Sequence, residues 1–294
     1  MLRLSNRSLL LEIGPTHLKA TLRGRWPRRA VRAAVERAWF ESAASLPPAS
    51  RPIASGEALE FGPALDSAFA ELGNVGALGG LAIDVVLSDA LVHFDIAQGR
   101  FGALGEQQLK SIAQACTQEL LGEQAAQFEV RFQLQRNEQH LLVCAVPIAL
   151  LSALRACAAG AGLRLRSVQP QFSKLWNRYG RKVQAGLGVL AVGDENHAMI
   201  ALVRHGVVEA LSSGSGLDQP EHAHGQPARR GRPRPAADPG TATPSGLDAK
   251  VDRLLASLGV ESCELDRLVA IVGGALAQAL SSRWTVMHDA GVAA

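Results

Sequence analysis

The chain has 294 residues, which is long enough to bury the core of one or two domains. Hydrophobic residues make up 47% of the sequence, as in an ordinary globular protein. The net charge of +3 is too small for this length to favour bulk nucleic-acid binding, so no nucleic-acid partner is expected.

The first predicted element is a β-hairpin. Two apolar runs, Leu9–Ile13 and Leu18–Arg23, flank a short turn that contains Gly14. Glycine in such a turn lets backbone N–H groups approach an anion closely, so the hairpin is a candidate phosphate loop. After a basic stretch and a proline-rich loop, the spacing of apolar residues over Glu57–Leu72 predicts a helix.

The middle of the chain alternates strand and helix patterns. Apolar residues recur on one helical face over Glu106–Leu121, and Gly122 ends that helix. The apolar stretch Leu141–Leu163 is long enough to span a bilayer, but Pro147 divides it, which favours a strand followed by a helix over Pro147–Ala161. The expected strands are Leu81–Leu87, Leu91–Ile96, Phe128–Leu134, His140–Val146 and Leu163–Val168.

The last third of the chain contains an abrupt change in composition. Residues 212–246 are dominated by Pro, Gly, Ala, Arg and His, with almost nothing to bury, which predicts a disordered linker. We expect the tail to fray after Trp284. Around the linker the expected strands are Val189–Val192, Ala198–Arg204, Val207–Leu211 and Leu268–Val272, and the expected helices are Lys250–Leu258 and Ala275–Leu280.

Four stretches share their order and spacing with one known class of proteins. They are the hairpin Leu11–Lys19, the strand-helix-strand-strand pattern over 84–146, the segment Val146–Phe172, and Leu190–Gly193 followed late by Val272–Gly274. In these stretches the chain resembles the actin-like proteins of type IV pilus and type II secretion machines. It is similar in particular to the PilM-like class and its MSHA-pilus biogenesis relatives, the MshI-like proteins.

The resemblance implies an α/β fold of the actin-like ATPase (ribonuclease H-like) type with an inserted strand-helix-strand-strand subdomain. The first actin-like half would comprise residues 1–80 and 147–170, and the inserted subdomain residues 81–146. The second half, which is reduced, would comprise residues 171–211 and 247–294, with the linker at 212–246 between its parts.

The resemblance also implies a nucleotide site in which phosphates lie between two glycine turns. A lysine on the first hairpin reaches toward the phosphates, and a glycine pair near the end of the chain belongs to the adenosine-binding turn. The matching residues in this chain are Glu12, Gly14, Thr16, Lys19, Gly193, Gly273 and Gly274.

Departures from the family pattern indicate that this site is degenerate. The second turn, read as Asp-x-Gly in the family, is Ala191-Val192-Gly193 here, and alanine has no side-chain oxygen for Mg²⁺. Asp194 and Glu195 follow at once, where their charges would repel phosphate oxygens. We therefore expect no catalytic residues, no metal site and no required cofactor, with ATP and Mg²⁺ binding kept as the alternative.

The function implied by the resemblance is that of a non-catalytic adaptor at the cytoplasmic face of the inner membrane. PilM-like proteins bind the cytoplasmic tail of a bitopic PilN-like partner, in a groove beside the inserted subdomain. No motif identifies the groove residues here. Val92, Phe94 and Ile96 lie on a candidate strand, where packing in the core is the competing interpretation. The basic segment Arg23–Arg37 offers a contact to an anionic membrane surface.

Two other interpretations remain open. The first is an active actin-like ATPase that switches assembly on ATP binding and depends on Glu12. The second is a lipid- or nucleic-acid-binding module that uses the basic segment, including Arg28 and Arg29, together with its tryptophans. The pair His222 and His224 lies in the expected linker without a cysteine nearby, so a structural zinc site is not favoured.

Overall fold

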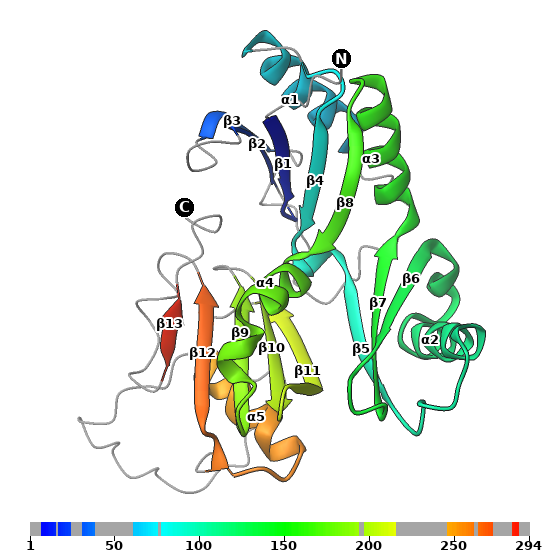
Figure 1. Cartoon of the computed structure of the whole chain (residues 1–294), viewed down its shortest axis with the longest axis vertical. Coiled ribbons are helices and arrows are strands. Elements are labelled where there is room, and N and C mark those ends of the chain that lie inside the picture. The colour runs from blue at the N-terminus through cyan, green and yellow to red at the C-terminus, as the bar shows by residue number, and fades with distance from the viewer. Residues whose placement is uncertain are drawn as a thin grey trace, which may run out of the picture. The chain divides into compact units, whose positions relative to one another are not determined.

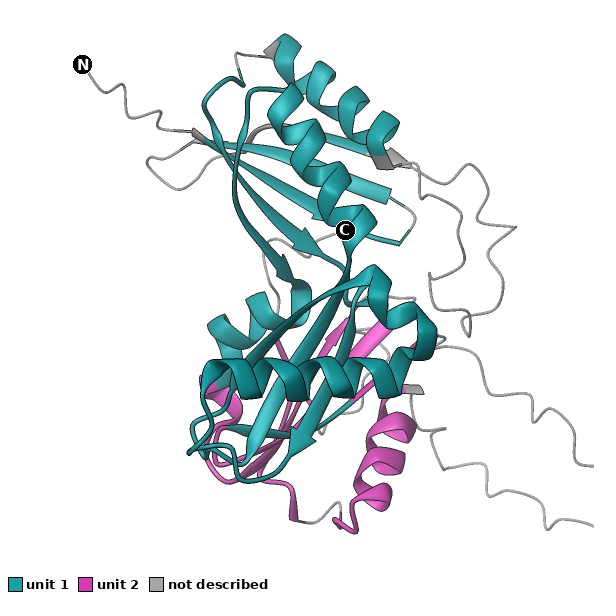
Figure 2. Cartoon of the chain, turned by 90° about the vertical axis from the view of Figure 1, so that its right-hand side faces the viewer, with its two compact units in different colours: residues 1–180, 207–211 teal, residues 181–206, 212–294 magenta. Residues whose placement is uncertain are grey.

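The computed structural model divides the chain into two compact units (Figure 2). Unit 1 comprises Met1–Gly180 with Val207–Leu211, and unit 2 comprises Arg181–Gly206 with Ser212–Ala294. Unit 1 therefore includes residues 171–180, which the resemblance assigns to the second half. The residues that the structure describes are 7–15, 17–24, 31–38, 61–75, 78–193, 197–215, 246–261, 264–272 and 284–287.

Unit 1 contains a five-stranded sheet in the order β3-β2-β1-β4-β8 (Figure 1). Neighbouring strands among β1, β2 and β3 are antiparallel, whereas β4 is parallel to β1 and β8 is parallel to β4. The predicted opening hairpin is confirmed, and β3 follows it where the sequence pattern indicated no element. The strands are β1 (Arg7–Ile13), β2 (His17–Gly24), β3 (Val31–Ala38), β4 (Ala82–Leu87) and β8 (Arg164–Pro170).

One face of this sheet is apolar because alternate residues of a strand point the same way. Leu9, Leu11 and Ile13 of β1 are almost completely buried on that face. Helices α1 (Phe61–Val75) and α3 (Ile148–Gly160) contribute their apolar residues to the same core. The other face of β1 carries Glu12, a residue of the predicted nucleotide site, which lies outside this core.

The predicted strand-helix-strand-strand order of the inserted subdomain is confirmed. Its three strands form a separate sheet in the order β5-β7-β6, and one face of that sheet shares a small apolar core with α2. The strand expected over 81–87 is β4, which pairs with β1 in the five-stranded sheet, so the insertion begins after it. The elements of the insertion are β5 (His93–Gln98), α2 (Glu106–Leu121), β6 (Phe128–Leu134) and β7 (His140–Pro147).

The long apolar stretch that follows is confirmed as a strand and a helix, β7 and α3. Within the described residues, no helix combines the length and apolar composition needed to cross a bilayer. After β8 the chain forms α4 (Gln171–Tyr179), which the sequence pattern did not predict. Short 3₁₀ helices lie at Asp89–Leu91, Gly122–Gln127 and Gly180–Val183.

A second five-stranded sheet has the order β11-β10-β9-β12-β13. The central strand β9 is antiparallel to β10 and parallel to β12, and all of its residues are buried. Both sheets thus place their strands in the same succession: third, second, first, fourth, fifth. The elements are β9 (Leu187–Gly193), β10 (His197–Arg204), β11 (Val207–Ser215), α5 (Gly246–Ser257), β12 (Arg267–Val272) and β13 (Thr285–Met287).

Two expectations for the last third of the chain are corrected. Residues 212–215 belong to β11 rather than to the linker, and β13 forms after Trp284, where the tail was expected to fray. The Trp284 indole Nε1–H donates to Asp248 Oδ1 of α5 at 2.8 Å, which holds this end of the chain in unit 2. The remaining linker, 216–245, and the helix expected at Ala275–Leu280 lie outside the described residues.

At the end of β9, neighbouring backbone atoms leave no room for a side chain on Gly193. A Cβ atom on Gly193 would lie 2.4 Å from the backbone oxygen of His197 and 2.8 Å from the Cα atom of Ala198. Because the obstructing atoms are backbone, we expect Gly193→Ala to lower the free energy of unfolding by about 1–3 kcal/mol. Chemical denaturation measures the change.

A matched glycine substitution provides the control. Gly73 lies in α1 with nothing within 4 Å of the position that a Cβ atom would take. Gly73→Ala should raise the free energy of unfolding by about 0.5–1 kcal/mol, because alanine loses less backbone entropy in a helix. Equal effects of the two substitutions would contradict the close approach at Gly193.

Candidate functional site

The first predicted phosphate turn joins β1 to β2. The Gly14 N–H donates to the carbonyl of His17 at 2.7 Å, which closes the turn. A Cβ atom on Gly14 would lie 3.0 Å from the His17 ring, so the turn leaves little room for a side chain. The glycine therefore serves hairpin closure, and its N–H is already bonded within the hairpin. Thr16 lies outside the described residues.

Glu12 is held by a cation that the sequence pattern did not identify. Lys174 of α4 places its Nζ atom 3.6 Å from Glu12 Oε1, and both side chains are largely buried, with exposed fractions of 24% for Lys174 and 22% for Glu12. Burial raises the pKa of the Glu12 carboxyl, although the charges of Lys174, Arg23 and Lys19 act in the opposite direction. The carboxylate is thus paired with an ammonium group supplied by the chain itself.

Lys19 lies in the middle of the hairpin sheet. It is directly opposite Glu12 of β1 and Glu36 of β3 in the strand register. Side chains at such opposed positions are cross-strand neighbours, so Lys19 lies between two acidic positions. Glu12, Gly14 and Lys19 therefore lie on one hairpin, and their part in nucleotide binding stays a prediction.

The second predicted phosphate turn follows β9 in unit 2. Gly193 ends this strand, and Ala191 is completely buried within it. Neither glycine nor alanine has a side-chain oxygen that could bind a metal ion. Gly273 and Gly274 lie outside the described residues. In the described part of the chain, no group of three or more His, Cys, Asp or Glu side chains is placed to hold a metal ion. The nucleotide interpretation of these residues stays a prediction.

The candidate groove residues near the start of the insertion have different environments. Val92 is buried in the core of unit 1. The Phe94 ring contacts the ring of Phe172 edge to face, with centroids 5.6 Å apart. Ile96 is half-buried on β5. Packing accounts for Val92 and Phe94, and the interpretation of Ile96 as a groove residue stays a prediction.

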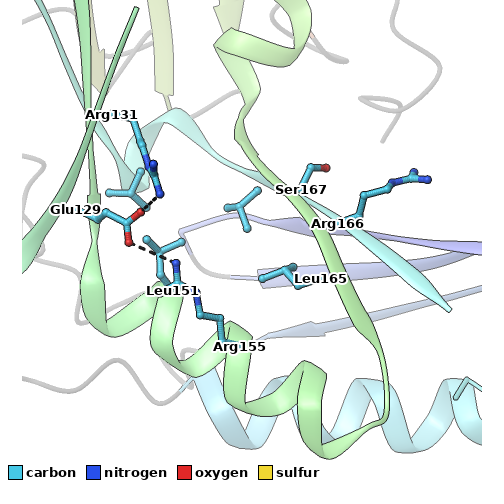
Figure 3. Close-up of a pocket in the computed structure, with 9 residues that line it drawn as sticks. Glu129, Arg131, Leu151, Arg155, Leu165, Arg166 and Ser167 are labelled. Carbon is cyan, nitrogen blue, oxygen red and sulfur yellow. Dashed lines mark hydrogen bonds and ion pairs between the residues drawn. The ribbon is translucent and has the colours of Figure 1, made fainter. Parts of the chain in front are cut away.

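A groove of about 390 Å³ lies between β6, α3 and β8, all within unit 1 (Figure 3). We call it the first groove. Apolar side chains of β7, α3 and β8 line it together with charged side chains at one end. The apolar residues are Val146, Leu151, Leu165 and Val168.

Three charged side chains form an ion cluster at the edge of the first groove. Glu129 of β6 pairs with Arg131 through Oε1 and with Arg155 of α3 through Oε2, the latter at 3.3 Å. Burial acts to raise the pKa of the Glu129 carboxyl. Hydrogen bonds and charges from the two arginines outweigh this effect, so the pKa lies below its ordinary value. Arg166 also lines the groove, but its guanidinium points away from the cluster and pairs with Asp84 (Figure 3).

A second groove, of about 540 Å³, follows the α2 side of the same strand β6. We call it the second groove. Glu129 and Arg131 line it as well as the first, so both grooves follow β6. Its other lining residues are Glu106, Lys110 and Gln114 of α2 and Phe128, Val130 and Phe132 of β6.

Sequence reasoning predicted β6 but not the grooves beside it. The alternation of polar and apolar residues over Phe128–Leu134 indicates a half-exposed strand. It does not reveal that Arg155, 26 positions beyond Glu129, approaches the same carboxylate. Arg155 and Glu129 become neighbours because the chain continues from β7, the last strand of the insertion, into α3, which carries Arg155.

The cysteines of the described residues are poor nucleophiles. Burial raises the pKa of the Cys144 thiol to about 12, with a further contribution from the charge of Asp89. Burial also raises the pKa values of Cys116 and Cys157. Because the thiolate is the reactive form, these thiols favour a structural role.

Comparison with solved structures shows which proteins share this architecture. The cytoplasmic domain of EpsL, an inner-membrane component of the type II secretion system of Vibrio cholerae, is similar with a TM-score of 0.50 and 12% identity. That similarity covers 96% of this chain and 90% of the EpsL chain. The chain has an actin-like ATPase fold.

Two further structures are similar with a TM-score of 0.49. One is a PilM–PilN type IV pilus biogenesis complex, at 15% identity over 71% of this chain and 61% of the other. The other is a Bacteroides thetaiotaomicron protein of unknown function with an actin-like ATPase fold, at 10% identity over 96% and 91%. No protein-family model and no curated protein matches the chain. At these identities a likeness shows fold alone, so function must be argued from the site.

Removal of the Lys174 ammonium should make stability more dependent on pH. Lys174→Met leaves the Glu12 carboxylate without its partner, which raises the pKa of Glu12 further. A raised carboxyl pKa in the folded state means that stability is lost as the pH rises through that pKa. We expect the variant to lose about 1 kcal/mol of unfolding free energy near neutral pH and less near pH 4.

Denaturant titrations at the two pH values measure this difference. Lys182→Met, at an exposed position, is the matched control and should change little at either pH. A loss from Lys174→Met that is the same at both pH values would show that the ammonium does not act on Glu12.

Proposed function

We propose that this protein is a non-catalytic assembly adaptor of a type II secretion or type IV pilus machine. In this role it binds the cytoplasmic tail of a bitopic inner-membrane partner of the PilN-like kind. The fold shared with the cytoplasmic domain of EpsL supports this proposal. Within these machines, the proposal includes the MSHA-like pilus, whose biogenesis proteins are among the relatives that the sequence resembles.

The first groove is the observation that carries the proposal. It combines apolar side chains for burial of a peptide with charged groups at one end that orient it. Such a groove suits an extended segment of a partner, which needs no catalytic group for docking. The groove lies between the inserted subdomain and β8, beside the subdomain that the sequence resemblance associates with the partner tail.

Two features of the candidate nucleotide site support loss of the ATPase chemistry. Glu12 is paired with Lys174, so its carboxylate is already partly neutralised by another side chain of the protein. Ala191 is buried where the family pattern has an acidic residue. In this proposal the protein keeps the fold of an ATPase but acts by binding a partner at its surface.

A position at the cytoplasmic face of the inner membrane follows from the proposed partner. The tail of a bitopic protein emerges directly from the bilayer, so an adaptor that binds it is held at the membrane surface. The basic segment Arg23–Arg37 would add attraction to anionic lipids there. Most of that segment lies outside the residues whose side chains the structure describes.

Titration with membrane-protein tails tests the adaptor function. Fluorescently labelled N-terminal tails of the bitopic proteins from the same pilus or secretion operon are added to the full chain. We expect one tail to bind with a dissociation constant in the micromolar range, about −8 kcal/mol. Arg155→Glu should weaken binding about tenfold or more, because it reverses a charge beside the first groove.

Arg181→Glu is the matched control for the charge reversal, since Arg181 is an exposed residue of unit 2. This variant should bind the tail as the unaltered protein does. Failure of every tail to bind at concentrations of about 1 mM would contradict the adaptor proposal.

Calorimetry with nucleotide tests the proposed loss of ATPase chemistry. Titration of the full chain with ATP, with and without Mg²⁺, should give no binding heat at concentrations of about 1 mM. Tight, Mg²⁺-dependent binding that disappears in Glu12→Ala would instead identify a nucleotide-switched assembly factor.

A further inference from the structure

The strand β6 has a free backbone edge. It lies at the end of the three-stranded sheet, and no strand of the described residues pairs with its outer side. The Gln135 N–H donates to the carbonyl of His140 at 2.9 Å, which fixes the hydrogen-bonded positions of the β6–β7 ladder. Because these positions alternate in an antiparallel pair, the backbone N–H and C=O groups of Val130 and Phe132 point away from β7.

The free edge has a defined extent. At one end, the Phe128 N–H is already bonded to the carbonyl of Ala125. At the other end, the Gln135 side chain exchanges two hydrogen bonds of 2.7 Å with the backbone of Val208, a residue of the same unit. The unoccupied part of the edge is therefore centred on Val130 and Phe132, and it can receive a short strand.

The two grooves lie on the two sides of this edge. The first groove meets α3 and β8, the second meets α2, and Glu129 and Arg131 line both of them. Successive side chains of a strand point to opposite faces of a sheet. A strand added to β6 would therefore direct alternate side chains into the first and second grooves.

Charge distinguishes the two grooves. In the second groove Lys110 is offset by Glu106. In the cluster at the first groove, one carboxylate faces two arginines, and Arg131 and Arg155 are exposed by 74% and 56%. Each guanidinium has five N–H donors, more than Glu129 can use. A further carboxylate would complete this cluster, because arginine pairs favourably with carboxylates.

We propose that β6 receives an extended segment of the partner as a fourth strand, with an acidic side chain taken up by Arg131 and Arg155. Apolar side chains on the same face of that segment pack on Leu151 and Leu165 in the first groove. Backbone pairing supplies affinity, and the alternating side chains supply specificity. This inference rests on the proposed adaptor function and specifies how the tail is recognised.

An alternating peptide tests this binding mode directly, whatever the full sequence of the partner. The probe is an eight-residue labelled peptide in which every second residue is threonine, and the residues between them are valine except for one glutamate, so that valine and glutamate share a face. The comparison peptides carry glutamine or lysine in place of that glutamate. We expect affinity to fall from the glutamate to the glutamine to the lysine peptide. The advantage of glutamate over glutamine should fall by about tenfold in Arg155→Ala, because the two changes remove the same interaction.

A backbone substitution separates strand addition from simple charge attraction. Val130→Pro removes an outward N–H and should weaken binding of the glutamate peptide by about tenfold, whereas Val130→Ala, which keeps that N–H, should retain most of it. Circular dichroism checks that both variants fold. Hydrogen exchange of the unaltered protein should show new protection of the amides of Val130 and Phe132 when the peptide is bound.

The outcomes are distinct. Equal binding of the glutamate and lysine peptides, or binding without protection of these amides, overturns strand addition at β6. If the membrane-protein tails bind but leave the β6 amides unprotected, the adaptor function stands and this inference fails. If the glutamate peptide binds as expected while no tail does, the edge is a docking site and the adaptor function fails.

Discussion

The buried carboxylate of Asp89 determines where helix α4 begins, and the candidate site depends on that helix. Asp89 is 4% exposed, and both of its oxygens lie 2.9 Å from the Phe172 N–H in the first turn of α4. A carboxylate at a helix N-terminus satisfies an otherwise unpaired N–H and interacts favourably with the helix dipole. Because Asp89 immediately follows the central part of the sheet, this contact fixes α4 against the end of β4. Lys174, two residues after Phe172 in α4, then reaches Glu12.

The same contact connects the sheet to the inserted subdomain. Phe172 is completely buried, and its ring meets Phe94 of β5 and stacks near Trp176. The insertion thus begins after β4, and the contact of Phe94 with Phe172 attaches its first strand, β5, to α4. The return through α3 brings Arg155 to Glu129 and forms the first groove. The ion cluster of Glu129, Arg131 and Arg155 lines that groove within unit 1.

The strand orders of the two sheets explain why backbone groups, as well as side chains, are available for binding at this groove. β8 ends the five-stranded sheet and β6 ends the three-stranded sheet, so two edge strands line the first groove. Proteins commonly protect exposed edges with charged residues, and Glu129 and Arg131 provide such charges on β6. Charges that discourage indiscriminate pairing also select a partner of complementary charge. The nucleotide chemistry of the fold is not needed for this kind of recognition.

Periodicity in the sequence was sufficient for the elements with a clear pattern, including the opening hairpin and the insertion, where the bounds of α2 and β6 were predicted as observed. It failed for β3, whose alternation is diluted by alanine and arginine, and for α4, a short helix that begins directly after a strand and Pro170. The sequence alone also determined that Ala191 offers no oxygen to a metal, because that depends only on residue type. Only the tertiary structure decided that Lys174 pairs with Glu12 and Arg155 with Glu129, because residues far apart in the chain become neighbours through the packing of helices on sheets.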